Sequence, residues 1–187
     1  MNAAALLIPH RCLVLSHTAL HQLRVSLERG TGVQSATYLQ EAGFASGEGV
    51  FNAFSEWVAA TYFVERPSDL DVQFLGEAMS GFFHECGWGT LVPDQIAQAA
   101  ICLDSADWAE ATPDSEAQYP SCHFSCGMLA DFLGRLSGGL VGVMEVECRS
   151  RGDSRCRFLG GSPETLHGLY ERMNQGMSYQ QALGIEG

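Results

Sequence analysis

The sequence contains no lysine: all 10 of its basic residues are arginines, against 22 acidic residues. Without lysine, the chain cannot form a Schiff base, hold pyridoxal phosphate covalently or build a lysine-dependent phosphate loop. The formal net charge of -12 also repels polyanions, because nucleic-acid binding depends on basic side chains that neutralise phosphates. These absences exclude several classes of enzyme and predict that the chain alone binds no DNA or RNA.

Long apolar runs are missing as well. No stretch approaches the roughly 18 apolar residues of a membrane span. The apolar start of the chain, residues 1–8, has no basic leader and is interrupted by Pro9, His10 and Arg11. The 7 cysteines are an odd number scattered along the chain, unlike the disulfide framework of a small secreted domain. We therefore expect a reduced, soluble, cytoplasmic protein with no membrane partner.

The remaining composition is that of one folded domain. With 187 residues, 46% of them hydrophobic, the chain can bury a core, and we treat residues 1–187 as a single domain. Glycines at positions 43, 47 and 49 interrupt the pattern of residues 33–62. We expect a break near residues 46–49, with close approach of another helix as the alternative. Apolar spacing predicts helices over residues 18–28, 33–62, 70–86, 122–136, 163–174 and 178–183.

Strands are expected in two regions. Ala97, Ala99 and Ile101 alternate, which favours a strand over residues 95–103. Residues 140–149 are rich in valine, and Gly152-Asp153 provides a turn before a second strand over residues 155–159. We expect an α+β fold, with helices packed on a small antiparallel sheet and a C-terminal β-hairpin. The acidic residues between these regions are expected to lie in a solvated loop: Asp104, Asp107, Glu110, Asp114 and Glu116.

Two cysteines of the hairpin are expected to face each other. If the turn is centred on Gly152, Cys148 and Cys156 are paired across the strands, about 4.5–5.5 Å apart at Cβ. This is close enough for two thiolates to share a metal, so the hairpin could supply half of a zinc site. Two buried free thiols explain the pair equally well, and a disulfide across the hairpin is a third interpretation. The pattern alone does not choose among the three.

A tetrahedral zinc site needs further donors from nearby. Strand alternation places Glu145 and Cys148 on opposite faces, so Glu145 can join only if the strand ends or bulges between them. Three thiolates and one carboxylate would leave a surplus of about two negative charges on Zn²⁺. The arginines of the hairpin could moderate this charge or form a partner surface: Arg149, Arg151, Arg155 and Arg157. The other candidate donors are Glu147, Cys122, His123 and Cys126.

At these residues the sequence resembles a known family, the vinyl-four-reductase domain. This family is similar in fold to the transport-particle subunits of Golgi tethering. It includes the bacteriochlorophyll 4-vinyl reductase-associated protein and the sensor domains of phenol- and xylene-responsive activators. The resemblance is strongest over residues 120–160. It rests on Pro120-Ser121-Cys122, Gly127, Glu145, Cys148, Gly152-Asp153, Cys156 and Phe158.

The resemblance implies zinc as a cofactor, with Cys122, Glu145, Cys148 and Cys156 as its ligands and Cys126 in reserve. Four protein ligands leave zinc no open position, so the metal would be structural and would not carry out hydrolysis. Where many members have a second glycine four residues after Gly127, this chain has Asp131, so close helix packing is not expected there.

A small-molecule-binding function, as a sensor or carrier, is the leading expectation for the whole chain. The resemblance implies a homodimer, and ligand occupancy would be passed to a separate effector protein. An enzyme is less expected than a binding protein, because no nucleotide fingerprint or nucleophile elbow is present. The alternatives are an accessory or reductase protein acting on a tetrapyrrole vinyl group, and an assembly module. The expected pocket for an aromatic or tetrapyrrole-like ligand is lined by Phe51, Phe54, Trp57, Tyr62, Phe82, Phe83, His84 and Trp88, although core packing is the commoner role for each aromatic residue.

Overall fold

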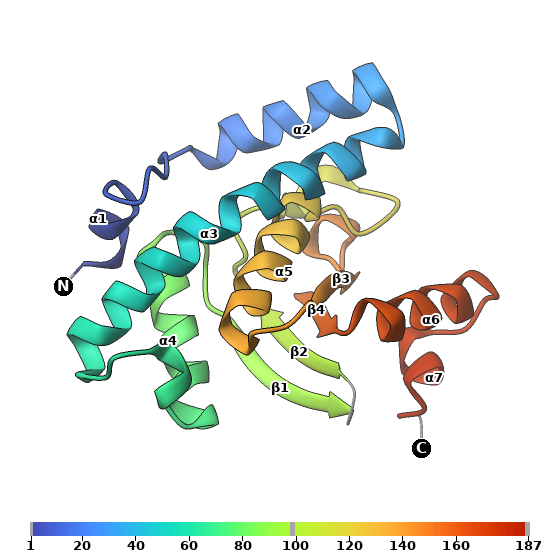
Figure 1. Ribbon diagram of the computed structural model, residues 1–187. Coiled ribbons are helices and arrows are strands. Elements are labelled where there is room, and N and C mark those ends of the chain that lie inside the picture. The colour runs from blue at the N-terminus through green and yellow to red at the C-terminus, as the bar shows by residue number, and fades with distance from the viewer. Residues whose placement is uncertain (1, 98–99, 186–187) are drawn as a thin grey trace.

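The computed structural model describes residues 2–97 and 100–185, and it consists of helices packed around a four-stranded sheet (Figure 1). The helix predicted over residues 163–174 has the same ends in the structure. The ends of the other predicted helices differ from the observed ends by a few residues. The helices are α1 (Ala3–Leu7), α2 (His17–Thr31), α3 (Gln34–Tyr62), α4 (Val72–Glu85), α5 (His123–Ser137), α6 (Pro163–Asn174) and α7 (Tyr179–Leu183). The strands are β1 (Val92–Ala97), β2 (Ala100–Ser105), β3 (Gly142–Glu147) and β4 (Cys156–Gly161), and short 3-10 turns lie at Pro67–Asp69, Pro113–Ser115 and Arg149–Arg151.

The sheet is antiparallel, with strand order β1-β2-β4-β3. Successive residues of a strand point to opposite faces. Leu103 and Phe158 accordingly enter the main core beneath α5 and α3, whereas Cys102 and Leu159 pack against α6 and α7 on the other face. The sheet is therefore covered on both sides, and the expected α+β class is confirmed (Figure 1).

Residues 95–103 differ from their prediction. The structure has two strands in this region, β1 and β2, where the alternation predicted one. Ala99, one of the alternating residues, lies outside the described part of the chain. The C-terminal hairpin is present as predicted: Gly152, with φ of 98°, ends the 3-10 turn between β3 and β4. Glycine is favoured at position 152 because of this left-handed backbone conformation, since an added Cβ would meet no neighbouring atom within 4 Å.

The break expected near residues 46–49 is wrong, because α3 runs unbroken for 29 residues. Its glycines serve the alternative role of admitting another helix. A Cβ atom on Gly43 would lie 1.9 Å from the carbonyl oxygen of Phe124, and one on Gly127 would lie 1.9 Å from that of Gln40. Helices α3 and α5 therefore meet backbone to backbone, and glycine is required on both.

Asp131 does not prevent this close approach. The side chain of Asp131 faces Gly47 of α3, where an added Cβ would lie 2.5 Å from the Asp131 Cβ. The missing second glycine of α5 is thus replaced by a glycine on the partner helix. The expectation that α5 would not pack closely at Asp131 is corrected on this point.

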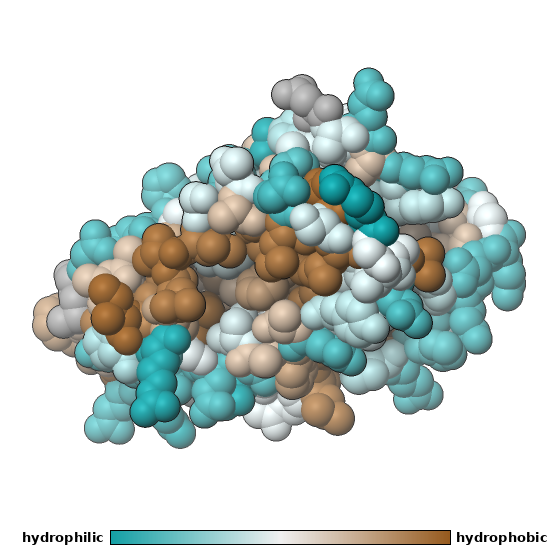
Figure 2. All heavy atoms as spheres, turned by 90° about the horizontal axis from the view of Figure 1, so that it is seen from above, coloured by the Kyte–Doolittle hydropathy of each residue, from teal (hydrophilic) through white to brown (hydrophobic). Residues whose placement is uncertain are grey.

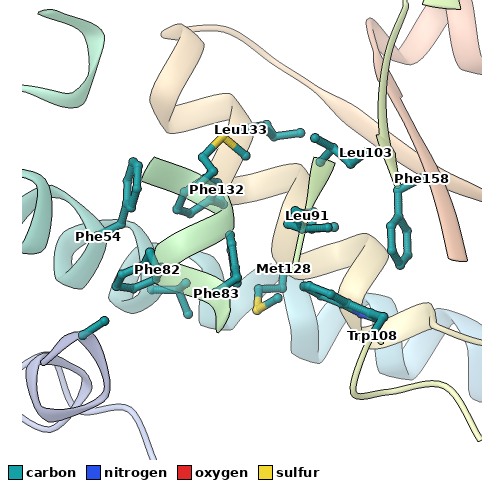
Figure 3. Close-up of a cluster of buried hydrophobic side chains, with 14 of the residues drawn as sticks. Phe54, Phe82, Phe83, Leu91, Leu103, Trp108, Met128, Phe132, Leu133 and Phe158 are labelled. Atoms are coloured by element: carbon teal, nitrogen blue, oxygen red, sulfur yellow. The ribbon is translucent and has the colours of Figure 1, made fainter. Parts of the chain in front are cut away.

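Large aromatic side chains fill the main core between α3, α4, α5 and the sheet (Figure 3). Phe54 and Phe83 contact Phe132 with ring centroids 5.1 Å and 5.3 Å apart. Leu91, Leu103 and Leu133 lie together at one side of this cluster. No helix among the described residues is long and apolar enough to cross a membrane.

Candidate metal centre and apolar cavity

Four buried side chains that are far apart in the sequence meet at the start of α5. The ligand atoms of Cys122, Glu145, Cys148 and Cys156 all lie within 4.8 Å of one another. The sulfur of Cys122 is 3.9 Å from that of Cys148 and 4.0 Å from that of Cys156. Two thiolates bound to one tetrahedral zinc ion, with Zn–S bonds of about 2.3 Å, lie about 3.8 Å apart. The spacing therefore matches a shared metal, and these cysteines form no disulfides.

The backbone brings each donor to this point by a different means. Cys122 is the N-cap residue of α5, and Cys148 and Cys156 lie where β3 ends and β4 begins. The last pair of the β3–β4 register is Glu147 with Arg157, and Cys148 and Cys156 are the next residues on the two segments. Between Glu145 and Glu147 the register shifts. This irregularity turns Glu145 to the face of Cys148, as the strand alternation required.

The carboxyl group of Glu145 is the clearest sign of a cation. Its Oε2 atom accepts a hydrogen bond of 2.9 Å from the backbone N–H of Cys122, while its Oε1 atom is buried without a partner. Burial, and then the nearby thiol of Cys148, raise the pKa of Glu145 to about 9. A buried carboxylate oxygen without a donor is costly, and a bound cation would satisfy it.

Hydrogen bonds already favour the anionic form of one thiol. Hydrogen bonding with the thiols of Cys122 and Cys156 lowers the pKa of Cys148, and a backbone hydrogen bond from Ser121 contributes in the same direction. Three thiolates and one carboxylate suit Zn²⁺ in both donor type and number. The four residues therefore fit zinc, and they would fill all of its coordination positions. A zinc ion held there would join α5 to the hairpin.

Three of the four hairpin arginines are engaged with carboxylates of their own. Arg151 pairs with Asp153, and Arg155 pairs with Glu147 at 2.8 Å. Arg157 binds the carboxylate of Asp104 through two hydrogen bonds of 2.7 and 2.6 Å. These pairs fix the hairpin and its link to β2, and they neutralise the positive charge of Arg151, Arg155 and Arg157.

A buried arginine from another helix lies nearer to the thiols. Arg24 of α2 is 4% exposed and donates a hydrogen bond of 2.9 Å to the hydroxyl of Ser121, which lies 3.8 Å from the sulfur of Cys148. Its Nε atom is buried without a hydrogen bond and lies 3.7 Å from the carboxylate of Glu28. Sequence analysis missed Arg24, because nothing in the pattern of α2 indicates that this residue faces the hairpin.

The other candidate donors lie outside the group of four. Cys126 is buried one turn into α5, and burial raises the pKa of its thiol well above the usual value. Glu147 is bound by Arg155 and by the hydroxyl of Tyr179. Burial lowers the pKa of His123, which favours a neutral ring.

The prediction that Glu110 lies in a solvated loop is wrong. Glu110 is 4% exposed, and its carboxyl group accepts hydrogen bonds from the backbone N–H of Phe124 at 3.0 Å and of Ser125 at 2.7 Å. Cys122 makes no side-chain capping bond, so Glu110 caps α5 from a distant loop. Trp108 is fully buried beside it and donates to the Ser125 hydroxyl.

Burial raises the pKa of Glu110 to about 7, against the lowering effect of its hydrogen bonds. Asp104 departs from the expected loop as well, because it belongs to β2 and is held by Arg157. The acidic composition of this segment gave no indication that Glu110 binds α5 or that Asp104 binds Arg157.

The residues expected to line a ligand pocket lie mostly in the aromatic cluster. Phe54, Phe82 and Phe83 are fully buried and pack edge to face (Figure 3). Others continue the same packing: Phe51 against Phe132, Trp57 against Tyr62 and Phe82, and Trp88 stacked on Trp108 and Phe124. His84 is exposed near the end of α4.

A cavity of about 1040 Å³ lies elsewhere, between α4, the sheet and the C-terminal end of α5. Its wall is mostly apolar and includes Leu91, Leu103 and Leu133, which also belong to the core. Met79 from α4 and Ile101 from β2 line it as well. None of the eight residues expected to surround a ligand is among its lining residues. Sequence analysis missed this cavity, because its wall combines residues from five separate segments.

This chain is similar to known proteins in sequence and in fold. Residues 109–162 match the family model of the vinyl-four-reductase domain. The chain is similar to the phenol-responsive sensory domain of the transcription activator PoxR, solved with phenol: 22% of residues are identical, the match covers 81% of this chain and 77% of that one, and the TM-score is 0.60.

A second structure with this fold is a trafficking protein particle complex subunit 3 from Naegleria fowleri, covalently bound to palmitic acid. The two chains are 11% identical, with coverage of 78% of this chain and 91% of that one and a TM-score of 0.60. No curated protein matches the sequence. Residues 109–162 thus match the vinyl-four-reductase domain family, as the resemblance predicted, and the chain shares its fold with a phenol-sensing domain and a trafficking-complex subunit.

Proposed function

We propose that this protein is a small-molecule-binding domain, a sensor or carrier, whose ligand lies in the cavity between α4 and the sheet. The observation that carries the proposal is the cavity itself: about 1040 Å³, mostly apolar, and floored by core leucines. Ligand sites are typically concave and apolar, with a few polar groups. The volume is ample for an aromatic compound and large enough for a tetrapyrrole-like one.

The relatives support this assignment. One protein of the same fold was solved with phenol and another with covalently bound palmitic acid, and both molecules are mainly apolar. In our proposal the metal centre is a structural zinc site formed by Cys122, Glu145, Cys148 and Cys156. Such a site would hold the start of α5 against the hairpin, while the other end of α5 borders the cavity.

The aromatic cluster is a second candidate position for an aromatic ligand. The Nε1 atom of Trp57 is buried there without a hydrogen-bond partner. A ligand acceptor group reaching this N–H would satisfy it. The rings of Trp57, Tyr62 and Phe82 would have to separate to admit a ligand.

Native mass spectrometry and absorption spectroscopy of the purified protein test the proposed function. A bound small aromatic or aliphatic compound supports the sensor or carrier role. A bound pigment would favour instead the accessory or reductase role on a tetrapyrrole vinyl group. Failure to bind any apolar probe would contradict both roles and leave the assembly module.

Mutations locate the ligand. Ser80→Phe adds bulk to the α4 wall of the cavity, and Ser26→Phe makes the same change on the exposed face of α2. Binding should be lost with Ser80→Phe and kept with Ser26→Phe. Loss with Trp57→Phe alone would move the site to the aromatic cluster.

We also propose that the chain forms a homodimer and passes ligand occupancy to a separate effector. Apolar side chains gather on the face shown in Figure 2, at the end where α1 lies. In this region Ile8, Leu13 and Val14 are 70%, 92% and 80% exposed. A second copy covering these residues would remove an apolar surface from water. Light scattering of wild type and Leu13→Asp/Val14→Asp distinguishes a dimer from a monomer.

A further inference from the structure

The wall of the cavity has an unusual charge. Its described lining residues include two carboxylates, Glu77 on α4 and Asp94 on β1, and no arginine or histidine. The chain has no arginine or lysine between Arg66 and Arg135, and most of the lining comes from this stretch. A ligand in the cavity would therefore meet negative charge without a compensating cation.

The two arginines that flank this stretch are held elsewhere. Arg66 binds Asp69 at 2.8 Å. Arg135 binds Asp131 at 2.7 Å and Glu48 at 3.3 Å, away from the lining. Neither is among the lining residues. An anionic ligand would have to draw one of them away from its carboxylate partner.

Three of the five uncharged polar side chains of the wall are also committed, which leaves the hydroxyls of Ser68 and Ser80 as uncharged donors. The hydroxyl of Ser162 caps α6 by accepting from the backbone N–H of Thr165, and that of Ser137 donates to the carbonyl of Gly134. The side-chain amide of Gln73 donates to Glu77. Burying a carboxylate without a counter-ion costs several kcal/mol, even where a hydroxyl can donate to it, whereas a neutral apolar molecule has no such cost.

We propose that the cavity selects uncharged apolar molecules, tolerates a cationic group near Glu77 or Asp94, and rejects anions. The inference rests on the proposed function and names the class of its ligand. It excludes free fatty acids and tetrapyrroles that carry ionised carboxylates, and it admits phenol-like compounds, alcohols, hydrocarbons and esters.

Three probes with the same ring system test the charge rule: 2-naphthalenemethanol, which is neutral; 2-naphthoate, an anion; and 2-naphthylmethylamine, a cation at pH 7. Dissociation constants come from calorimetry at about 0.15 M salt, where long-range attraction to the chain's net charge is screened beyond about 8 Å. We expect naphthoate to bind at least tenfold more weakly than the alcohol, and the amine to bind as well as the alcohol or better.

The carboxylates are tested by the double variant Glu77→Gln/Asp94→Asn. Amine binding should weaken about two- to fivefold, naphthoate binding should strengthen, and alcohol binding should stay the same. The matched control is Glu41→Gln/Glu116→Gln, which removes the same net charge from exposed positions outside the cavity. Equal effects of the two double variants would show that net charge, and not the cavity wall, sets the preference.

The outcomes separate the charge rule from the proposed function. If naphthoate binds as tightly as the alcohol, and cavity-filling variants abolish both, the cavity binds ligands but the charge rule is wrong. If no probe binds, or if binding survives both Ser80→Phe and Ile101→Trp, the proposed cavity function is wrong and the charge rule falls with it. Thermal unfolding of each filling variant confirms that it is folded.

Discussion

At the scale of single residues, the unpaired Oε1 atom of Glu145 gives the metal centre its main test. We expect one zinc per chain in the wild type and loss of most of it in Cys148→Ser, since three ligands bind zinc far less tightly than four. Glu145→Gln removes the charge at nearly constant size, and it should weaken zinc binding at least tenfold. Metal analysis and competition with a chromophoric chelator measure both effects. Less than a tenth of an equivalent in the wild type would end the zinc proposal.

Arg24 permits a second test of the same centre. Its charge lies one hydroxyl away from Cys148, and supporting residues of metal sites typically contribute 10- to 100-fold in affinity. Arg24→Gln should therefore weaken zinc binding by about this factor. Arg29→Gln, an exposed change on the same helix, should leave it unaltered. Equal zinc affinities of the two variants would make Arg24 purely structural.

Glu110 gives stability a pH dependence. Its pKa rises from 4.5 to about 7 on folding, so the folded state binds the proton more strongly than the unfolded state. The stabilisation is complete below pH 4.5 and is lost as pH rises to about 7, amounting to roughly 3 kcal/mol. Because the raised pKa of Glu145 lowers stability over the same range in both proteins, urea unfolding from pH 4.5 to 8 should show a loss that is larger in wild type than in Glu110→Gln by about this amount. Parallel pH profiles of the two proteins would contradict it.

At the scale of elements, the close contact of α3 and α5 makes two glycines essential. Ala at position 43 or 127 places a Cβ 1.9 Å from a backbone oxygen of the other helix, and the helices must separate to accept it. We expect Gly43→Ala and Gly127→Ala each to cost about 3 kcal/mol or more. Chemical denaturation measures this cost.

Gly30→Ala is the matched control for these variants. Gly30 lies in the last turns of α2, and an added Cβ would meet nothing within 4 Å. Alanine stabilises helices relative to glycine by up to about 1 kcal/mol. The control should therefore be neutral or stabilising. A similar loss in all three variants would mean that the α3–α5 contact is not the cause.

The elements also show what the sequence could predict. The helices, to within a few residues at their ends, and the C-terminal hairpin follow from local spacing, and the structure has them. The role of Gly43 did not follow, because a glycine that ends a helix and one that admits a neighbour look alike until the neighbour is placed. Glu110 was missed for a related reason: its partners lie on α5, and only the tertiary fold brings them to it.

At the scale of the whole molecule, the four-residue cluster lies where α5 meets β3 and β4, and the Cys122 N–H already donates to Glu145 across this junction. A metal held there would link α5 to both strands more firmly, and α6 and α7 rest on the same strands through Leu166, Leu169 and Tyr179. Tyr179 also binds Glu147 and accepts a hydrogen bond from Arg157. Helices α1 and α2 share no ligand with the centre.

Removal of the metal should therefore loosen the molecule unevenly. After chelation, hydrogen exchange should accelerate most in β3, β4, α6 and the start of α5, and least in α1 and α2. Re-addition of zinc should restore protection and control for damage by the chelator. A uniform increase in hydrogen-exchange rate along the chain would contradict a metal centre that stabilises only the elements around it.

The shifted register beside Val146 explains why two donors separated by an odd number of residues can lie on the same face of the sheet. Two residues of one strand can share a face only when an even number of steps separates them, yet Glu145 and Cys148 are three steps apart and meet at one point. An odd spacing between two such donors therefore records a bulge in the backbone. Any related sequence that keeps a glutamate three places before this cysteine can be expected to contain the same bulge, and one that changes the count by a single residue must bind differently or not at all.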